Sequence, residues 1–198
     1  MFNRMLNFFI ANKSNRDKWI KEKVSQIESN KKILDAGCGQ QPYRKHCDKL
    51  KYYSQDFNQY TGEGDGLQVK DWEYGKLDYI GNIWEIKEED NFFDTILCTE
   101  VIEHIPYPNE TIAEFSRLLK KNGTLILTAP YASLPHFEPY FYYSGFSKYW
   151  FTYTLVKFGF EVVEITPNGN FFKFLIQESL RGANIIKNPI IKIFPGFN

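Results

Sequence analysis

The chain has 198 residues, its 24 Lys and Arg balance its 24 Asp and Glu, and 18% of its residues are aromatic. This length suits a single domain that buries about 70% of the surface of its unfolded chain. A net charge of zero provides no overall positive field, which argues against a nucleic-acid partner. No apolar run approaches the roughly 18 residues that cross a bilayer, and no secretory signal is recognisable.

The cysteines are Cys38, Cys47 and Cys98, and their spacing fits neither a disulfide framework nor a zinc site. Cys38 and Cys98 fall at the ends of expected strands, where a thiol packs as a small apolar side chain. A reduced compartment is the simplest setting for such cysteines. We therefore expect a soluble, cytoplasmic protein.

The first 30 residues predict two helices. Residues 2–10 carry apolar side chains at helical spacing, which favours a helix that caps the domain. Peripheral contact with a membrane surface, or with a second copy in a homodimer, is the alternative role for this helix. Ser14 can cap a second helix, whose Ile20, Val24 and Ile27 share one face.

A short apolar run at residues 32–36 is followed by Gly37 and Gly39. A buried strand that ends in a glycine turn directs backbone N–H groups into the crevice at the carboxyl edge of a parallel sheet. Asp56, 17 residues after Gly39, ends a second expected strand and can accept hydrogen bonds from ribose hydroxyls. The pattern predicts a nucleotide-type site. Pro42 occupies the position of the third glycine of a dinucleotide fingerprint, which disfavours a nicotinamide dehydrogenase.

Strands and helices alternate along the chain. Besides residues 32–36, we expect strands at residues 51–56, 77–80, 94–98, 124–128 and 160–166, and helices at residues 43–50, 112–119 and 147–158. Residues 57–74 predict a long loop over the site. This alternation indicates an α/β fold with a doubly wound, mostly parallel sheet.

Several motifs follow one another in a fixed order. They are Asp35-x-Gly37-x-Gly39, Asp56, Asn82-Ile83, the strand at 93–98, Glu100-Val101-Ile102-Glu103-His104 and the segment 118–125. Over roughly residues 30–166, this set resembles class I S-adenosylmethionine-dependent methyltransferases. The resemblance implies a seven-stranded-type, Rossmann-like sheet. Either Ile190–Phe194 supplies the seventh, antiparallel strand, or that C-terminal strand is missing.

The resemblance also implies which residues bind S-adenosylmethionine. Asp35, Gly37 and Gly39 would border the methionine end, Asp56 the ribose and Asn82-Ile83 the adenine, while Glu100 would close the other side; Cys38, Phe57 and Thr99 complete the implied cofactor-binding set. Many members have a third glycine where this chain has Gln41. We therefore expect a wider turn here, or a different hold on the methionine end.

His104 is the candidate catalytic residue, because an imidazole at the carboxyl edge of the sheet can act as a general base. It could instead only anchor its loop. A metal site is a further alternative: Glu100, Glu103 and His104 share one face if their segment is helical, and His136 could add a ligand. This spacing resembles quinone-biosynthesis O-methyltransferases and small-RNA 2′-O-methyltransferases, which use magnesium or a similar ion. Imidazole suits such a hard cation poorly.

The aromatic stretch at residues 137–143 is expected to line or cover an acceptor pocket, and its mixed polar and aromatic character suits a small organic acceptor. With residues 135–140, it resembles bacterial methyltransferases of polysaccharide and cell-envelope synthesis. We expect methyl transfer to a small-molecule or glycan- or lipid-linked acceptor, at oxygen. A metal-dependent RNA 2′-O-methyltransferase and a non-catalytic partner subunit that binds S-adenosylmethionine are the rival hypotheses.

We expect one methyltransferase domain over residues 1–198. It would consist of N-terminal helices (1–30), a cofactor-binding core (31–166) that includes an acceptor insert (131–149), and a C-terminal helix with an apolar tail (171–198).

Overall fold

The computed structural model describes residues 12–63, 67 and 71–185. Its centre is a sheet of five parallel strands in the order β3-β2-β1-β4-β5. The strands are β1 (Lys32–Ala36), β2 (Lys51–Asp56), β3 (Tyr79–Ile80), β4 (Phe93–Thr99) and β5 (Leu119–Thr128). The strand order reverses between β1 and β4, so the expected doubly wound sheet is confirmed, with five strands rather than seven in the described part of the chain.

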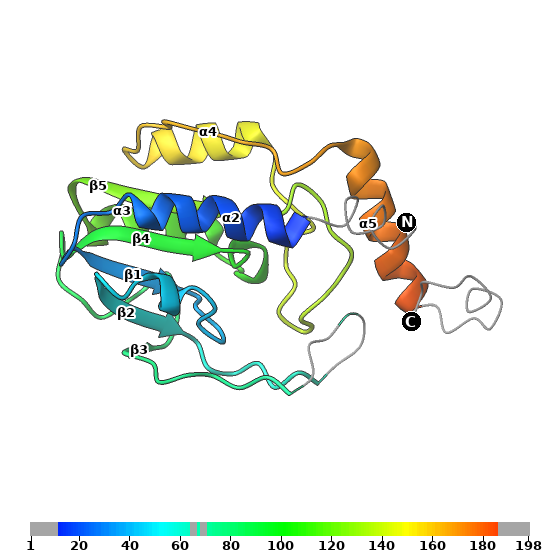
Figure 1. Cartoon of the computed structure of the whole chain (residues 1–198), viewed down its shortest axis with the longest axis horizontal. Helices are drawn as coiled ribbons and strands as arrows, with labels where there is room; N and C mark the ends of the chain where they lie inside the picture. Colours follow the sequence, from blue (N-terminus) through cyan, green and yellow to red (C-terminus); the bar gives the residue numbers. More distant parts are fainter. Residues whose placement is uncertain (1–11, 64–66, 68–70, 186–198) are drawn as a thin grey trace.

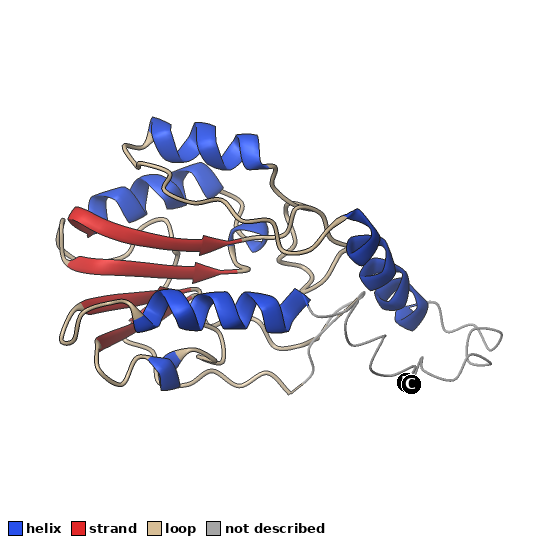
Figure 2. Cartoon of the chain, turned by 45° about the horizontal axis from the view of Figure 1, so that its top comes forward, coloured by secondary structure: helices blue, strands red, loops and turns tan. Residues whose placement is uncertain are grey.

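Helices lie on both sides of the sheet (Figures 1 and 2). They are α2 (Asn12–Ser25), α3 (Pro108–Leu118), α4 (Lys148–Lys157) and α5 (Phe171–Ile185), with single 3₁₀ turns η1 (Arg44–His46) and η2 (Ile102–His104). The helix expected from residue 147 is α4, and Ser147 caps it by accepting a 3.2 Å hydrogen bond from the backbone N–H of Trp150. None of the described helices is both long and apolar enough to cross a membrane.

Alternate residues of the central strands enter two separate cores. Ile33 of β1 and Leu97 of β4 pack with Ile20 and Val24 of α2 on one face. Their sequence neighbours on the opposite face pack against α3 and α4, in a cluster that includes Leu34, Ala36, Ile96, Cys98, Ile112, Phe115 and Leu118. Because side chains alternate across a strand and both faces are covered, the central strands are apolar almost throughout.

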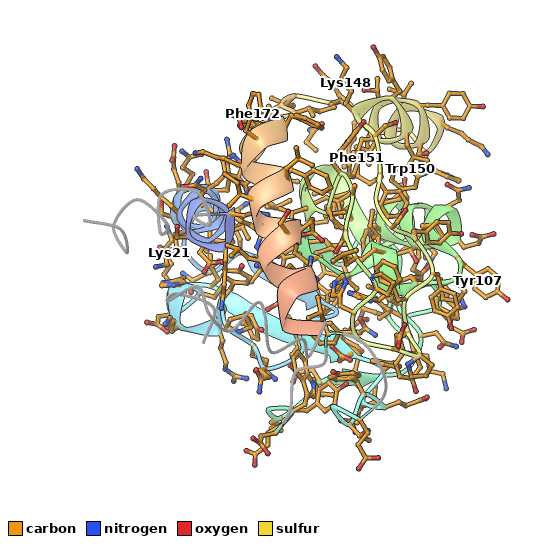
Figure 3. All side chains as sticks on the ribbon, turned by 90° about the vertical axis from the view of Figure 1, so that its right-hand side faces the viewer. Lys21, Tyr107, Lys148, Trp150, Phe151 and Phe172 are labelled. Atoms are coloured by element: carbon orange, nitrogen blue, oxygen red, sulfur yellow. The ribbon has the colours of Figure 1, made fainter. Side chains whose placement is uncertain are left out.

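The strands point toward α5 and the insert, residues 131–149, so the carboxyl edge of the sheet faces these two segments (Figure 1). Viewed from that side, α5 crosses in front of the sheet and Phe172 lies at one end of it (Figure 3). The described residues of the loop expected at residues 57–74 also lie at this edge, where Leu67 forms a bridge with His136 of the insert. The sheet therefore carries these three segments at the edge where doubly wound folds bind ligands.

Several expected elements differ from the structure. Residues 160–166 form no strand: they have no regular secondary structure, and Glu164 is bound by Lys23 and Trp19 of α2. The helix expected at 43–50 is only the 3₁₀ turn η1, which ends where the Cys47 N–H donates to the Arg44 carbonyl. The strand expected at 124–128 begins earlier, at Leu119, which pairs with Phe93 ahead of a bulge.

Two predictions fall outside the described residues. These are the amphipathic helix at residues 2–10 and the seventh strand at Ile190–Phe194. The helix expected from residue 171 is confirmed as α5.

An ion pair on α3 between buried Glu114 and half-buried Arg117 fixes the connection that precedes β4. The Glu114 carboxylate accepts a 2.7 Å hydrogen bond from the backbone N–H of Ile86 and binds Arg117 through both oxygens. Arg117 also donates to the backbone carbonyls of Ile86 and Glu88. A connection without regular structure is thereby tied to the helix that covers the sheet.

We expect Glu114→Ala to lower the free energy of unfolding by about 1–3 kcal/mol, because it leaves the Ile86 N–H buried without an acceptor. Chemical denaturation measures this change. Glu110→Ala, at an exposed position of the same helix, is the control and should change stability by no more than about 0.5 kcal/mol. Equal effects of the two substitutions would show that the buried hydrogen bond contributes nothing.

Candidate cofactor and acceptor site

The glycine turn after β1 is held by the end of β2. Gly37 and Gly39 have φ values of 69° and 50°. The N–H groups of Gly37 and Cys38 donate to the backbone carbonyl of Gln55 at 2.9 and 3.0 Å, and the Gly39 N–H donates to Asp56 Oδ2 at 2.8 Å. Asp56 therefore shapes the turn and also faces the cleft that the turn borders.

Gln55 is a residue that sequence reasoning missed. Its side chain is buried, accepts from the Gly37 N–H at 3.1 Å and donates to the Gly81 carbonyl at 2.7 Å. It thus joins the glycine turn to the segment that follows β3. A polar residue next to Asp56 at the end of an expected strand was the available signal.

Nine of the ten expected cofactor residues line the same extended cleft, which includes the carboxyl edge of the sheet. They are Gly37, Cys38, Gly39, Asp56, Phe57, Asn82, Ile83, Thr99 and Glu100. Asp35 does not line it. Its side chain is buried beside β2 and accepts a 2.6 Å hydrogen bond from the Tyr52 hydroxyl, and burial raises the pKa of this carboxyl to about 7. Asp35 therefore lies beneath the turn, on the α2 face of the sheet.

Gln41, at the position of the third glycine, keeps a left-handed backbone with φ of 55°. Its amide donates to the Lys76 carbonyl at 2.8 Å and its oxygen accepts from Arg44. The turn thus retains a conformation typical of glycine, and the added side chain fastens the segment that leads to β3.

An aromatic cover lies over the glycine turn. A Cβ at Gly39 would come within 2.7 Å of Trp72 Cζ2. The Trp72 ring contacts Tyr60 and Phe137 at centroid distances of 5.3 and 5.4 Å, and Phe57 contacts Tyr140 at 4.7 Å. The loop at 57–74 and the insert therefore meet above the cleft, which brings the expected cofactor and acceptor segments into contact.

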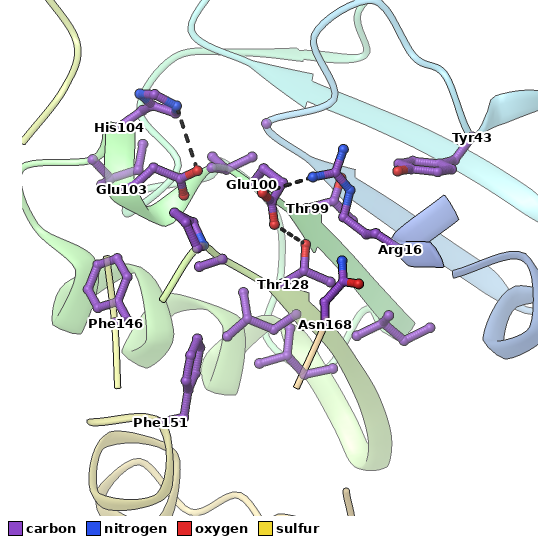
Figure 4. Close-up of a pocket in the computed structure, with 18 of the residues that line it drawn as sticks. Arg16, Tyr43, Thr99, Glu100, Glu103, His104, Thr128, Phe146, Phe151 and Asn168 are labelled. Carbon is purple, nitrogen blue, oxygen red and sulfur yellow. Dashed lines mark hydrogen bonds and ion pairs between the residues drawn. The ribbon is translucent and has the colours of Figure 1, made fainter. Parts of the chain in front are cut away.

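Glu100 is separated from the other expected metal ligands. Glu100 has a left-handed backbone with φ of 54°, so the chain turns away from the direction of β4 at this residue. Because η2 begins only at Ile102, Glu100, Glu103 and His104 do not lie on one face of a helix, contrary to the expectation from their spacing. The Glu100 carboxylate instead binds Arg16 at 2.8 Å and accepts from Thr128 at 2.9 Å (Figure 4). Arg16, from α2, is a further cleft residue that the sequence did not reveal.

Glu103, His104 and His136 do come together. One ligand atom from each lies within 4.8 Å of the other two, and the two imidazole centroids are 4.7 Å apart. Burial, with a smaller effect of His136, lowers the pKa of His104 to about 4. His104 is therefore neutral near pH 7, and a neutral imidazole offers one unprotonated nitrogen to a proton or a cation.

The amino-acid sequence matches a family described as methyltransferase domain over residues 13–165. The chain belongs to this methyltransferase family. The resemblance to class I S-adenosylmethionine-dependent methyltransferases, drawn from the ordered motifs, is thereby confirmed.

Solved methyltransferase structures share the fold. A methyltransferase candidate from Bacillus halodurans has a TM-score of 0.56 at 18% identity, over 75% of this chain and 71% of that one. Phosphoethanolamine N-methyltransferase 2 of Haemonchus contortus, solved with S-adenosylmethionine, has a TM-score of 0.58 at 16% identity, over 92% of this chain and 45% of that one. At these identities the likeness extends to the fold alone.

An uncharacterised protein of Methanocaldococcus jannaschii is 30% identical over 117 residues. The match covers 56% of this methyltransferase-family chain and 48% of that protein. The chain thus matches about half the length of this relative.

The buried carboxyl of Asp35 predicts a dependence of stability on pH. Its folded-state pKa of about 7 exceeds the usual 3.8, so the folded state favours the protonated form. Its stabilising contribution is complete below about pH 4 and is lost as the pH rises through 7, at up to about 1.4 kcal/mol per pH unit. We expect Asp35→Asn to reduce this loss, as measured by denaturation at several pH values.

Asp48→Asn, which removes the same charge at an exposed position, separates the effect of burial from that of net charge. Parallel stability curves for the parent protein and Asp35→Asn between pH 4 and 8 would contradict the prediction.

Proposed function

We propose that the protein transfers a methyl group from S-adenosylmethionine to an oxygen of a small-molecule or glycan- or lipid-linked acceptor. The observation that carries this proposal is the single cleft in which the glycine turn, Asp56 and Asn82 meet the aromatic insert. The cleft lies at the carboxyl edge of the sheet, where the strand order reverses. Family membership supports the reaction class.

Asp56 is the proposed partner of the cofactor ribose. Its Oδ1 accepts a 3.3 Å hydrogen bond from the Asn58 N–H, and a carboxylate oxygen can accept two hydrogen bonds. Burial raises the pKa of this carboxyl, while the hydrogen bond from the Gly39 N–H opposes the rise. Asp56 is thus pre-oriented by the turn and retains capacity for a hydroxyl group.

The remaining cofactor contacts follow the cleft. Gly37, Cys38 and Gly39 are proposed to border the methionine end, and Asn82 with Ile83 the adenine. Ile83 is buried and Asn82 is exposed, which gives the base one apolar wall and one amide. When bound, S-adenosylmethionine supplies an electrophilic methyl group, and the protein contributes orientation and electrostatics.

The acceptor is proposed to lie against the insert. Phe137, Tyr140 and His136 line the cleft beside His104. Aromatic rings with a few polar groups suit a small or sugar-linked organic molecule. The balanced charge of 24 basic and 24 acidic residues favours such an acceptor over RNA.

Attack by a hydroxyl oxygen requires that its proton be removed or loosened. The side chains proposed to do this are those of Glu103 and His104, beside the insert, and of His136 within it. Neutral His104 can take up a proton directly or act as a ligand to a cation that acidifies the hydroxyl.

We expect S-adenosylmethionine to bind with micromolar affinity, and Asp56→Asn to weaken binding about 10- to 100-fold. The factor corresponds to one charge-assisted hydrogen bond of about 1.5–3 kcal/mol. Calorimetric titration measures both affinities. Glu63→Gln, an exposed acid in the neighbouring loop, is the matched control and should leave the affinity unchanged.

Circular dichroism of Asp56→Asn checks that the glycine turn has not simply unfolded. Failure of the parent protein to bind S-adenosylmethionine at millimolar concentration would refute the proposed function.

A further inference from the structure

Glu103 is a buried acid whose carboxylate lacks a partner. The residue has an exposed fraction of 0%, and among the described residues no hydrogen-bond donor reaches either carboxylate oxygen. The nearest candidate, His104 Nε2, is 3.7 Å from Oε1. A charge that is buried without a partner is costly. Such an acid needs a proton or a cation.

Two backbone carbonyls orient the imidazoles beside Glu103. His104 Nδ1 lies 2.6 Å from the Tyr140 carbonyl, and His136 Nδ1 lies 3.0 Å from the Leu134 carbonyl. A carbonyl only accepts hydrogen bonds, so each Nδ1 carries the proton. Each Nε2 is therefore left with its lone pair. This arrangement is typical of histidines that bind a metal through one nitrogen and are oriented through the other.

The donor set selects the kind of cation. Two imidazole nitrogens and one carboxylate suit zinc, cobalt, iron or similar ions, whereas magnesium prefers oxygen ligands throughout. The ligand atoms lie within 4.8 Å of one another. The ligand atoms of a tetrahedral zinc ion are about 3.4 Å apart, so the most distant pair here would close in by up to about 1.4 Å on binding.

We infer that Glu103, His104 and His136 form a three-ligand site for a borderline transition-metal ion, and that metal binding fastens the insert to the core. The functional meaning of this fastening rests on the proposed function, because the insert is the proposed wall of the acceptor cleft. The magnesium hypothesis and the membership of Glu100 are both replaced by this assignment.

The insert already surrounds the site from several sides. It contributes His136 as a ligand and the Tyr140 carbonyl as the partner of His104, and the N–H groups of Tyr142 and Tyr143 donate to the Glu103 carbonyl. A metal ion bound to Glu103 and His104 of η2 and to His136 of the insert would cross-link two segments that are 32 residues apart.

Phe137 connects the proposed metal site to the aromatic cover over the glycine turn. Its ring is 5.2 Å from His104 and 5.4 Å from Trp72, which covers Gly39. Metal binding therefore orders the wall of the acceptor cleft and, through Phe137, supports the aromatic cover over the glycine turn.

The test uses the full-length protein after chelation and dialysis. We expect one equivalent of Co²⁺ to bind, with visible d–d absorption, and Zn²⁺ to displace it, while a hundredfold excess of Mg²⁺ does not. Hydrogen exchange of residues 131–146 should slow when Zn²⁺ is bound. His136→Ala should weaken Co²⁺ binding by more than the roughly 10- to 100-fold that loss of an outer partner costs, and should abolish the protection.

His46→Ala is the matched control, because His46 is the remaining histidine of the chain and belongs to η1, outside the proposed metal site. It should leave Co²⁺ binding and exchange unchanged. Thermal unfolding of His136→Ala checks its fold, and Glu103→Gln provides a second variant with nearly unchanged shape.

Absence of Co²⁺ and Zn²⁺ binding, or binding unaffected by Glu103→Gln and His136→Ala, would overturn the site. A preference for Mg²⁺ would overturn the metal class, and metal binding without protection of the insert would overturn the fastening. S-adenosylmethionine titration of the same metal-free protein tests the proposed function separately.

Discussion

The site depends on how the end of β2 satisfies the glycine turn after β1. Three consecutive N–H groups of that turn, from Gly37 to Gly39, donate to Gln55 and Asp56. The turn has left-handed residues and cannot pair within a strand or helix, so these donors need partners from elsewhere. Parallel pairing of β1 with β2 supplies them, because it brings Ala36 and Gln55 into register. The parallel pairing of β1 with β2 thus both builds the sheet and shapes the crevice at its carboxyl edge.

The other side of the crevice is built from segments without regular structure. The loop at 57–74 and the insert pack against each other through aromatic rings, with Phe137 in contact with both Trp72 and His104. Aromatic side chains bury large apolar areas with few rotatable bonds, which lets irregular segments pack over a polar site. The high aromatic content of the chain is therefore used, in part, to cover the carboxyl edge of the sheet.

Buried acids occupy different positions relative to this edge. Asp35 faces Tyr52 beneath the turn, Asp56 binds the turn itself, and Glu103 faces two histidines. Glu100 is paired with Arg16. The first two and Glu100 have donors from the protein, while the Glu103 carboxylate has none among the described residues. This difference in hydrogen bonding singles out Glu103 as the acid that is suited to an external cation.

The sequence by itself determined the fold class, the glycine turn, the carboxylate at the end of β2 and the helix that follows Ser147. These features depend on local periodicity, on glycine and capping chemistry, and on the order of strands and helices. All of these can be recognised from residues that are close together in the sequence. Only the tertiary structure decided that Glu100 pairs with α2 while Glu103 joins His104 and His136. It also revealed Gln55 and Arg16, and left residues 160–166 without strand pairing. Those outcomes depend on side-chain direction after a left-handed residue and on contacts between distant segments, which no local pattern encodes.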